Sequence, residues 1–167
     1  MRAMVSIQLH LCFRQGPSAL IWVTMRNVFQ TRGLRRYAFP THTNDLIYDR
    51  SAAVCSEAFF VVLRPGQAPP RHKHDDTEQV FYILKGRGVL TIGARAKGHS
   101  VRAGDVVLVP PGTWHSIRAV GGPMRYLAVD CFGTRKKLES TWDEHVRAMC
   151  RERGWNYAEV TGRRKAR

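Results

Sequence analysis

Cysteine is scarce and scattered in this chain, and no Cys-x-x-Cys pair occurs; the four copies are Cys12, Cys55, Cys131 and Cys150. The irregular spacing excludes zinc knuckles and dithiol redox motifs. Buried, reduced thiols are typical of a protein in a reducing compartment. We therefore expect a cytoplasmic protein without a disulfide framework.

Long hydrophobic runs are also lacking, and a membrane-spanning helix needs about 20 apolar residues. The apolar stretch near the start is interrupted by Gln8 and His10 and ends at Arg14, without a clear small-residue cleavage site. We predict no membrane association. Residues 1–24 are interpreted as a disordered extension, or as translation from an upstream start with Met25 as the working one. A leader peptide is the alternative.

Acidic residues are few: 13 Asp and Glu stand against 27 Lys and Arg, for a net charge of +14. Such a balance raises the question of nucleic-acid binding. The basic residues are dispersed, however, with local runs only at 32–36, 135–137 and 163–167. No basic helix, RNA-binding sheet motif or zinc-finger spacing accompanies them. A preference for anionic small molecules is the better interpretation, and nucleic-acid binding is the weakest alternative.

Short strand patterns separated by turns occupy the middle of the chain. Glu57 to Leu63 is rich in aromatic and β-branched residues and stops at Arg64-Pro65-Gly66. Short apolar pieces from Met25 to Arg50 indicate edge strands that lead into a barrel. This pattern predicts an all-β, small antiparallel barrel or jelly roll as a single domain over residues 25–133. Further strands are expected over 80–84, 89–92, 99–102, 106–109, 115–120 and 125–132.

The pattern changes in residues 134–167. An apolar stripe recurs there at helical spacing, through Leu138, Trp142, Val146 and Met149. Thr141 and Glu144 have the spacing of a capping box, and Gly154 is a typical helix stop. We predict one amphipathic helix, packed on the barrel or on a partner subunit, followed by a basic tail from Gly162.

Three histidines carry the chemical signal. His72 and His74 are one residue apart, so an extended backbone would point both imidazoles to the same face. His115 follows the Pro110-Pro111-Gly112 turn that ends another predicted strand. Neutral imidazole is the commonest nitrogen ligand for first-row metals, so these residues predict a divalent-metal site.

Both histidine stretches resemble the paired motifs of the cupin superfamily. The first motif is matched by Gly66, His72, His74 and Gly86, and the second by Gly104, Pro110, Gly112 and His115. The resemblance covers about a third of the chain. It implies a small antiparallel barrel that binds iron, manganese, nickel or zinc. It also implies a homodimer, to which the 25–50 arm could contribute by crossing to a neighbour.

The fourth ligand position of the motif falls on Gln79, whereas the family expects a glutamate there. Glu78 is one residue out of register and is the alternative ligand. Gln79 lies an odd number of residues after His74, so the Asp75-Asp76-Thr77 segment must turn or bulge if both are to face the metal. A neutral amide leaves more positive charge on the metal than a carboxylate does, which favours Lewis-acid chemistry. At the site the chain is similar to cupins that act on sugar acids with three histidines and a glutamine.

Other polar and aromatic residues are assigned smaller roles. Trp114 neighbours His115 and is expected on the opposite face, as a packing residue, and Phe81 and Ile83 are expected in the barrel core. The unmatched histidines are interpreted as surface or packing residues: His10, His42, His99 and His145. A proton-transferring side chain is sought among Tyr82, Tyr126 and Asp130.

Together these observations predict a metal-dependent enzyme that acts on a small, anionic molecule through His72, His74, Gln79 and His115. The reaction would be of the isomerase or lyase type, or a dioxygenase reaction. The alternative is a non-catalytic cupin that binds or senses a small molecule. The fold alone cannot decide, because this fold hosts many functions.

Overall fold

The strands form two antiparallel sheets in the computed structural model, which describes residues 27–133 and 141–162 of the chain. The predictions for residues 1–24 and for the basic tail beyond Gly162 lie outside the described residues. Within the described ranges the strands are β1 (Arg35–Ala38), β2 (Thr43–Tyr48), β3 (Ser56–Leu63), β4 (Thr77–Lys85), β5 (Arg87–Ile92), β6 (Lys97–Arg102), β7 (Val106–Val109), β8 (His115–Ala119) and β9 (Met124–Phe132).

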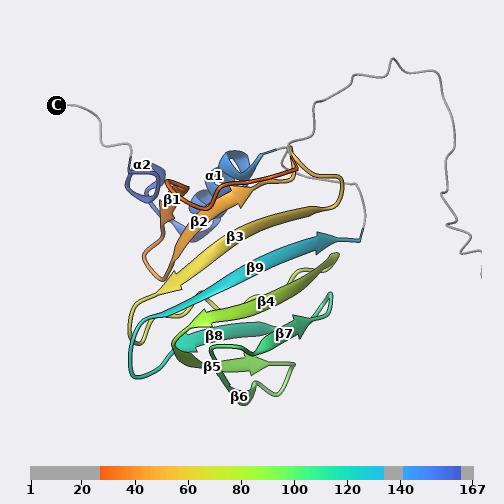
Figure 1. Ribbon diagram of the computed structural model, residues 1–167, viewed down its shortest axis with the longest axis vertical. Coiled ribbons are helices and arrows are strands. Elements are labelled where there is room, and N and C mark those ends of the chain that lie inside the picture. Colours follow the sequence, from red (N-terminus) through yellow and green to blue (C-terminus); the bar gives the residue numbers. More distant parts are fainter. Residues whose placement is uncertain (1–26, 134–140, 163–167) are drawn as a thin grey trace, which may run out of the picture.

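One sheet has six strands in the order β1-β2-β3-β9-β4-β7, and the other has three in the order β6-β5-β8 (Figure 1). All strand pairs are antiparallel, and β9 is central because it pairs with both β3 and β4. The predicted all-β antiparallel fold is confirmed. In the described ranges two strands precede Arg50, but only β1 is an edge strand as predicted, because β2 pairs with both β1 and β3 of its own chain.

Alternating burial explains how the strands build a core. In β4, Thr77, Gln79, Phe81 and Ile83 are buried, whereas Glu78 and Tyr82 face outward. The same period of two runs along β9, where Met124, Tyr126, Ala128 and Asp130 are buried. The inward positions of both strands are mainly apolar, so most of this row fills the barrel. Of the polar exceptions Thr77, Gln79 and Asp130, the last two line the cavity of the candidate site.

Gly86, the last residue of the first motif, occupies a position that only glycine can fill without strain. Its φ of +83° lies in the left-handed region, and an added Cβ would lie 2.3 Å from the carbonyl oxygen of Pro123. A side chain at this position would therefore clash with backbone as well as strain it. Gly86 lets β4 turn directly into β5.

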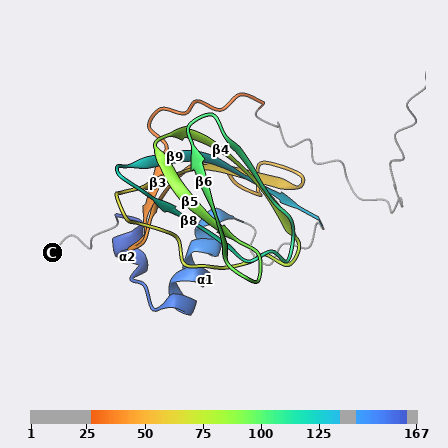
Figure 2. The ribbon, with the colours of Figure 1, turned by 90° about the horizontal axis from the view of Figure 1, so that it is seen from below.

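Two helices follow the strands, α1 (Trp142–Arg153) and α2 (Tyr157–Val160), and Figure 2 shows them together on one side of the barrel. The predicted capping box is present, because Thr141 accepts from the Glu144 backbone N–H and the Glu144 side chain accepts from the Thr141 backbone N–H. Gly154 ends α1 in the left-handed conformation, as predicted. Leu138 lies outside the described residues. Among the described helices, none is both long and apolar enough to span a membrane.

The buried face of α1 packs on the first strands of the large sheet. Trp142 is fully buried, with its ring centroid 4.6 Å from that of Phe59 and 6.3 Å from that of Tyr37. Its backbone N–H donates to the Asp49 carboxylate at 2.9 Å. The predicted amphipathic helix thus packs on its own barrel.

Candidate metal centre

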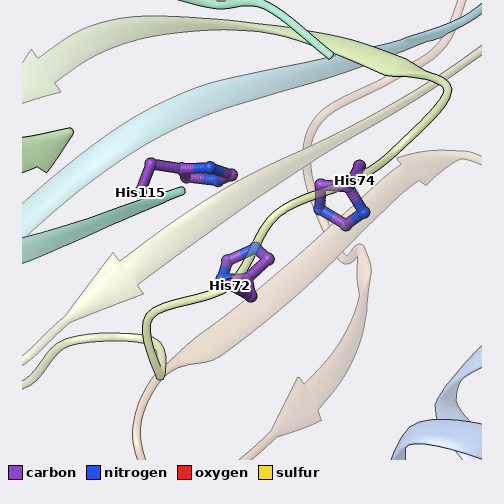
Figure 3. Close-up of side chains that lie close together, drawn as sticks. All are labelled: His72, His74 and His115. Atoms are coloured by element: carbon purple, nitrogen blue, oxygen red, sulfur yellow. The ribbon is translucent and has the colours of Figure 1, made fainter. Parts of the chain in front are cut away.

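Three imidazoles lie close together (Figure 3). His72 and His74 come from the segment between β3 and β4, and His115 is the first residue of β8. One ring nitrogen of each residue lies within 4.8 Å of the corresponding atoms of the other two. The structure therefore brings together the three histidines that the sequence singled out, in an arrangement that could hold a metal ion.

Backbone hydrogen bonds fix this arrangement. His72 and His115 form a reciprocal antiparallel bridge, with N···O distances of 3.1 and 2.8 Å. The Gly112 N–H of the Pro-Pro-Gly turn donates to the His74 carbonyl at 2.7 Å. The two sequence motifs are therefore tied together at the positions that carry the imidazoles.

Side-chain hydrogen bonds orient two of the rings. His72 Nδ1 lies 2.7 Å from the Pro70 carbonyl oxygen, and His115 Nδ1 lies 2.9 Å from that of Thr113. A carbonyl only accepts, so each Nδ1 carries the proton and each Nε2 keeps its lone pair. Nε2 of His115 is buried and has no hydrogen-bond partner.

Burial also keeps the imidazoles neutral. Burial, together with the neighbouring histidines, lowers the pKa of His72, His74 and His115 to about 4. Neutral imidazole is the form that binds metal. The cluster is therefore in its ligating protonation state at neutral pH.

Gln79, and not Glu78, faces the interior. Residues 75 and 76 form bends, so the parity change expected between His74 and Gln79 occurs there. Gln79 is buried and lines the same cavity as the histidines, whereas Glu78 is exposed. The amide nitrogen of Gln79 donates to Asp130 Oδ1 at 2.8 Å, and its carbonyl oxygen is buried without a partner.

Gln79 ends a polar row across the inner face of the large sheet. Asp130 of β9 is paired with Glu57 of β3 on one side and with Gln79 of β4 on the other. Arg50 donates two hydrogen bonds to Glu57, at 2.8 and 2.7 Å. Burial, together with the Glu57 carboxylate, raises the pKa of Asp130 to about 7.

The cluster opens into a cavity of about 540 Å³. Asp130 and Tyr126 line it, but Tyr82 is exposed on the outer face of β4, so its candidacy for proton transfer is wrong. Trp114 also lines the cavity and is 40% exposed; it is not the packing residue we expected. Residue 114 precedes β8 and is outside the strand, so alternation did not apply.

Sequence reasoning did not find several cavity-lining residues. His42 and His145 had been interpreted as surface or packing residues, and they line the cavity together with the end of α1. Burial lowers the pKa of His42 to about 3 and that of His145 to about 4. No local sequence pattern identifies these residues as cavity-lining, because their positions depend on where α1 and the β1–β2 connection pack.

Comparison with known proteins agrees with this architecture. The family model described as "Cupin domain" matches residues 59–130, a range that contains all four candidate ligands. The oxalate-binding protein of Thermotoga maritima is 37% identical over 68 residues, which are 40% of this chain and 54% of that protein. The chain spans about half the length of the curated relatives it matches.

Solved structures share the fold at low sequence identity. A predicted oxalate decarboxylase from Thermotoga maritima superposes with a TM-score of 0.58 at 23% identity, covering 63% of this chain and 98% of that one. The polyketide cyclase RemF from Streptomyces resistomycificus gives a TM-score of 0.56 at 16% identity, with 72% and 94% covered. Residues 59–130 thus match the cupin family model, and the fold is the one that these solved structures share.

Proposed function

We propose that this cupin binds a divalent metal through His72, His74, Gln79 and His115 and acts on a small, anionic molecule in the adjoining cavity. The proposal rests on one observation above all. His115 Nε2 and Gln79 Oε1 are both buried and lack hydrogen-bond partners beside two further imidazoles. Buried polar atoms are seldom left unpaired, and a metal ion would satisfy both.

The ligand set favours particular chemistry. Three imidazoles and an amide carry no charge, so a bound divalent ion keeps its full charge and would act as a Lewis acid on a substrate oxygen. The protein's own part is to orient the ligands and to enclose the substrate in the cavity. Asp130 and Tyr126 are the buried side chains at which a proton could be held there. Isomerase or lyase chemistry follows most directly, with dioxygenase chemistry as the other enzymatic class.

Elemental analysis tests the metal site. We expect close to one iron, manganese, nickel or zinc ion per chain in the purified protein, and loss of that metal in the His72→Ala/His115→Ala variant. His99→Ala is the matched control, because His99 is an exposed histidine on β6. Absence of metal from the wild type, even after reconstitution, would overturn the proposal.

A non-catalytic binding or sensing protein is the second candidate. This candidate is supported by the curated relative that is named an oxalate-binding protein. Incubation of the metal-loaded protein with small carboxylic acids, followed by product analysis and an oxygen electrode, separates the candidates. Turnover with oxygen uptake indicates a dioxygenase, turnover without it an isomerase or lyase, and saturable binding without turnover the binding protein.

Location, domain organisation and assembly complete the proposal. We infer a cytoplasmic homodimer in which residues 25–133 form the barrel and residues 134–167 form a helical appendage with a basic tail. Support for the dimer comes from the outer face of β4 and β7, where Tyr82, Leu84, Val106 and Leu108 are exposed. β7 is the last strand of its sheet, so its free edge could pair with a second copy.

A further inference from the structure

The end of α1 forms one wall of the cavity beside the candidate metal centre. The wall residues are His145, Ala148, Met149, Glu152, Arg153 and Trp155. All of them lie beyond residues 59–130, the range that matches the cupin family model. This wall is therefore an addition to the matched domain, and it can give the cavity a specificity that the barrel alone does not set.

Arg153 differs from the other cations on the cavity wall in having no polar partner. Arg71 donates to the carbonyl oxygens of Gly93 and Ala94, and Lys73 pairs with Asp75. For Arg153, no hydrogen bond or carboxylate partner is found in the described parts of the chain. Its guanidinium lies over the Trp155 ring, 5.6 Å from the centroid. The donors of Arg153 are therefore available to a ligand.

The position of Arg153 relates it to the histidines. Arg153 lines the same cavity as the three histidines and His42. Gly154, with φ of +66°, then reverses the chain so that Trp155 packs near Phe39, with ring centroids 5.6 Å apart. This turn holds the last residue of α1 against the cavity and supports the guanidinium from one side.

A purely structural role is the competing interpretation. A cation in the last turn of a helix interacts favourably with the helix dipole, and a guanidinium over an indole is a common stabilising pair. Arg151 occupies the same last turn, but it is exposed and does not line the cavity. Comparison of the two arginines therefore separates a dipole effect from ligand recognition.

We propose that Arg153 is the anion-recognition residue of the cavity and binds a carboxylate of a small organic acid whose other end reaches the three-histidine site. This inference rests on the proposed function for the ligand's second contact. The planar fork of N–H donors on arginine matches a carboxylate in a bidentate manner, and the guanidinium lies over the indole of Trp155 at the wall. The ligand class is therefore a small dicarboxylate or hydroxy acid.

Calorimetric titration of metal-loaded protein with oxalate, malonate and succinate tests the role of Arg153. We expect Arg153→Gln to weaken the tightest-bound of these anions by about tenfold to a hundredfold, the range for lost charged hydrogen bonds. Arg153→Lys should fall between the wild type and Arg153→Gln, because it keeps the charge without the fork. Arg151→Gln should bind as the wild type does, and metal content should be the same in all four proteins.

The outcomes separate this inference from the metal proposal. Equal affinity in the wild type and Arg153→Gln, or an equal loss in Arg151→Gln, overturns the inference. Failure of all three anions to bind also overturns it. If the protein takes up no metal, the same titrations on the metal-free form decide, because the guanidinium contact does not require the ion. Binding that is weakened by Arg153→Gln then supports the inference alone.

Discussion

The amide nitrogen of Gln79 donates a 2.8 Å hydrogen bond to Asp130 Oδ1, and this contact leaves the amide oxygen of Gln79 for another partner. When Asp130 is ionised it only accepts, so Gln79 turns its nitrogen toward Asp130 and its carbonyl oxygen away from it. That oxygen is buried and unpartnered. Asp130 thus prepares Gln79 to offer an oxygen to a metal ion, although Asp130 itself need not touch the ion.

Replacement of Asp130 by asparagine tests this orienting role. In the Asp130→Asn variant the new amide can either donate or accept, so Gln79 is no longer held in one orientation. We expect metal affinity to fall by about tenfold, the lower end of the range for lost outer contacts of metal ligands. Competition with a chelating dye measures the affinity. Asp75→Asn, which changes an exposed carboxylate near His74, should leave the affinity unchanged, and equal affinities in all three proteins would contradict the orienting role.

The Gln79→Glu variant changes the charge of the ligand set. A glutamate there would place a third buried carboxylate in the row with Asp130 and Glu57, which destabilises the metal-free protein through repulsion and desolvation. A bound divalent ion would relieve that repulsion. Thermal unfolding should therefore give a lower Tm than the wild type without metal, and a larger rise of Tm when metal is added. A rise no larger than that of the wild type would argue against Gln79 as a ligand.

The sequence predicted those elements whose pattern is local. Alternating strands, the stripe and capping box of α1, and the motif-matched histidines each depend on residues close together in the chain. Gln79 was also predictable, because the bends at residues 75 and 76 had to reset the alternation before β4. Once Gln79 faces inward, Tyr82 has to face outward, so its exclusion from the cavity was already implied.

The cavity wall beyond the barrel was not predictable in the same way. Arg153 and His145 face the cavity because α1 packs on Phe59 and Tyr37 through Trp142, a contact between segments far apart in the sequence. Amphipathicity identifies the buried face of a helix but not its partner. The prediction for Trp114 was wrong for another reason. Side-chain alternation holds within a strand, and Trp114 lies just outside one.

Acid should destabilise the metal-free protein. Five imidazoles have a pKa of about 4 or lower in the folded state, His42, His72, His74, His115 and His145, against 6.5 as the ordinary value. Between about pH 6.5 and pH 4 the unfolded chain therefore binds more protons, and the free energy of unfolding falls as the pH falls. Asp130 and Glu57 have the opposite effect on the pH dependence of stability, because burial raises the pKa of both. The five imidazoles exceed these two carboxyl groups in number, so we expect their effect to dominate.

Urea unfolding of the metal-free protein at several pH values between 7.5 and 4.5 measures this dependence. The His42→Gln variant removes one of the five titrating groups at a position that is not a candidate ligand, so its stability should depend less steeply on pH. A wild-type stability that stays level or rises toward pH 4.5 would show that the imidazoles are not held neutral in the folded state.

The capping box at the start of α1 makes a separate prediction. Thr141→Ala removes the side-chain oxygen that accepts from the Glu144 backbone N–H, and we expect a loss of about 1 kcal/mol in the free energy of unfolding. Thr141→Ser keeps the hydroxyl and should lose little. Chemical denaturation monitored by tryptophan fluorescence gives both values. An equal loss in both variants would mean that the methyl group of Thr141, rather than its hydroxyl, stabilises the helix.

The outer face of β4 and β7 predicts how two copies would meet. Val106 and Leu108 are 65% and 55% exposed on an edge strand, and Val106 is paired with the exposed Tyr82. An apolar face beside a free strand edge favours association with a second copy by a twofold axis. We expect the Val106→Lys/Leu108→Lys variant to elute at the monomer mass in size-exclusion chromatography with light scattering, and the wild type at twice that mass. Val54→Lys, an equally exposed apolar residue in the loop before β3, should remain a dimer; a monomeric wild type, or a dimeric double variant, would place any interface elsewhere.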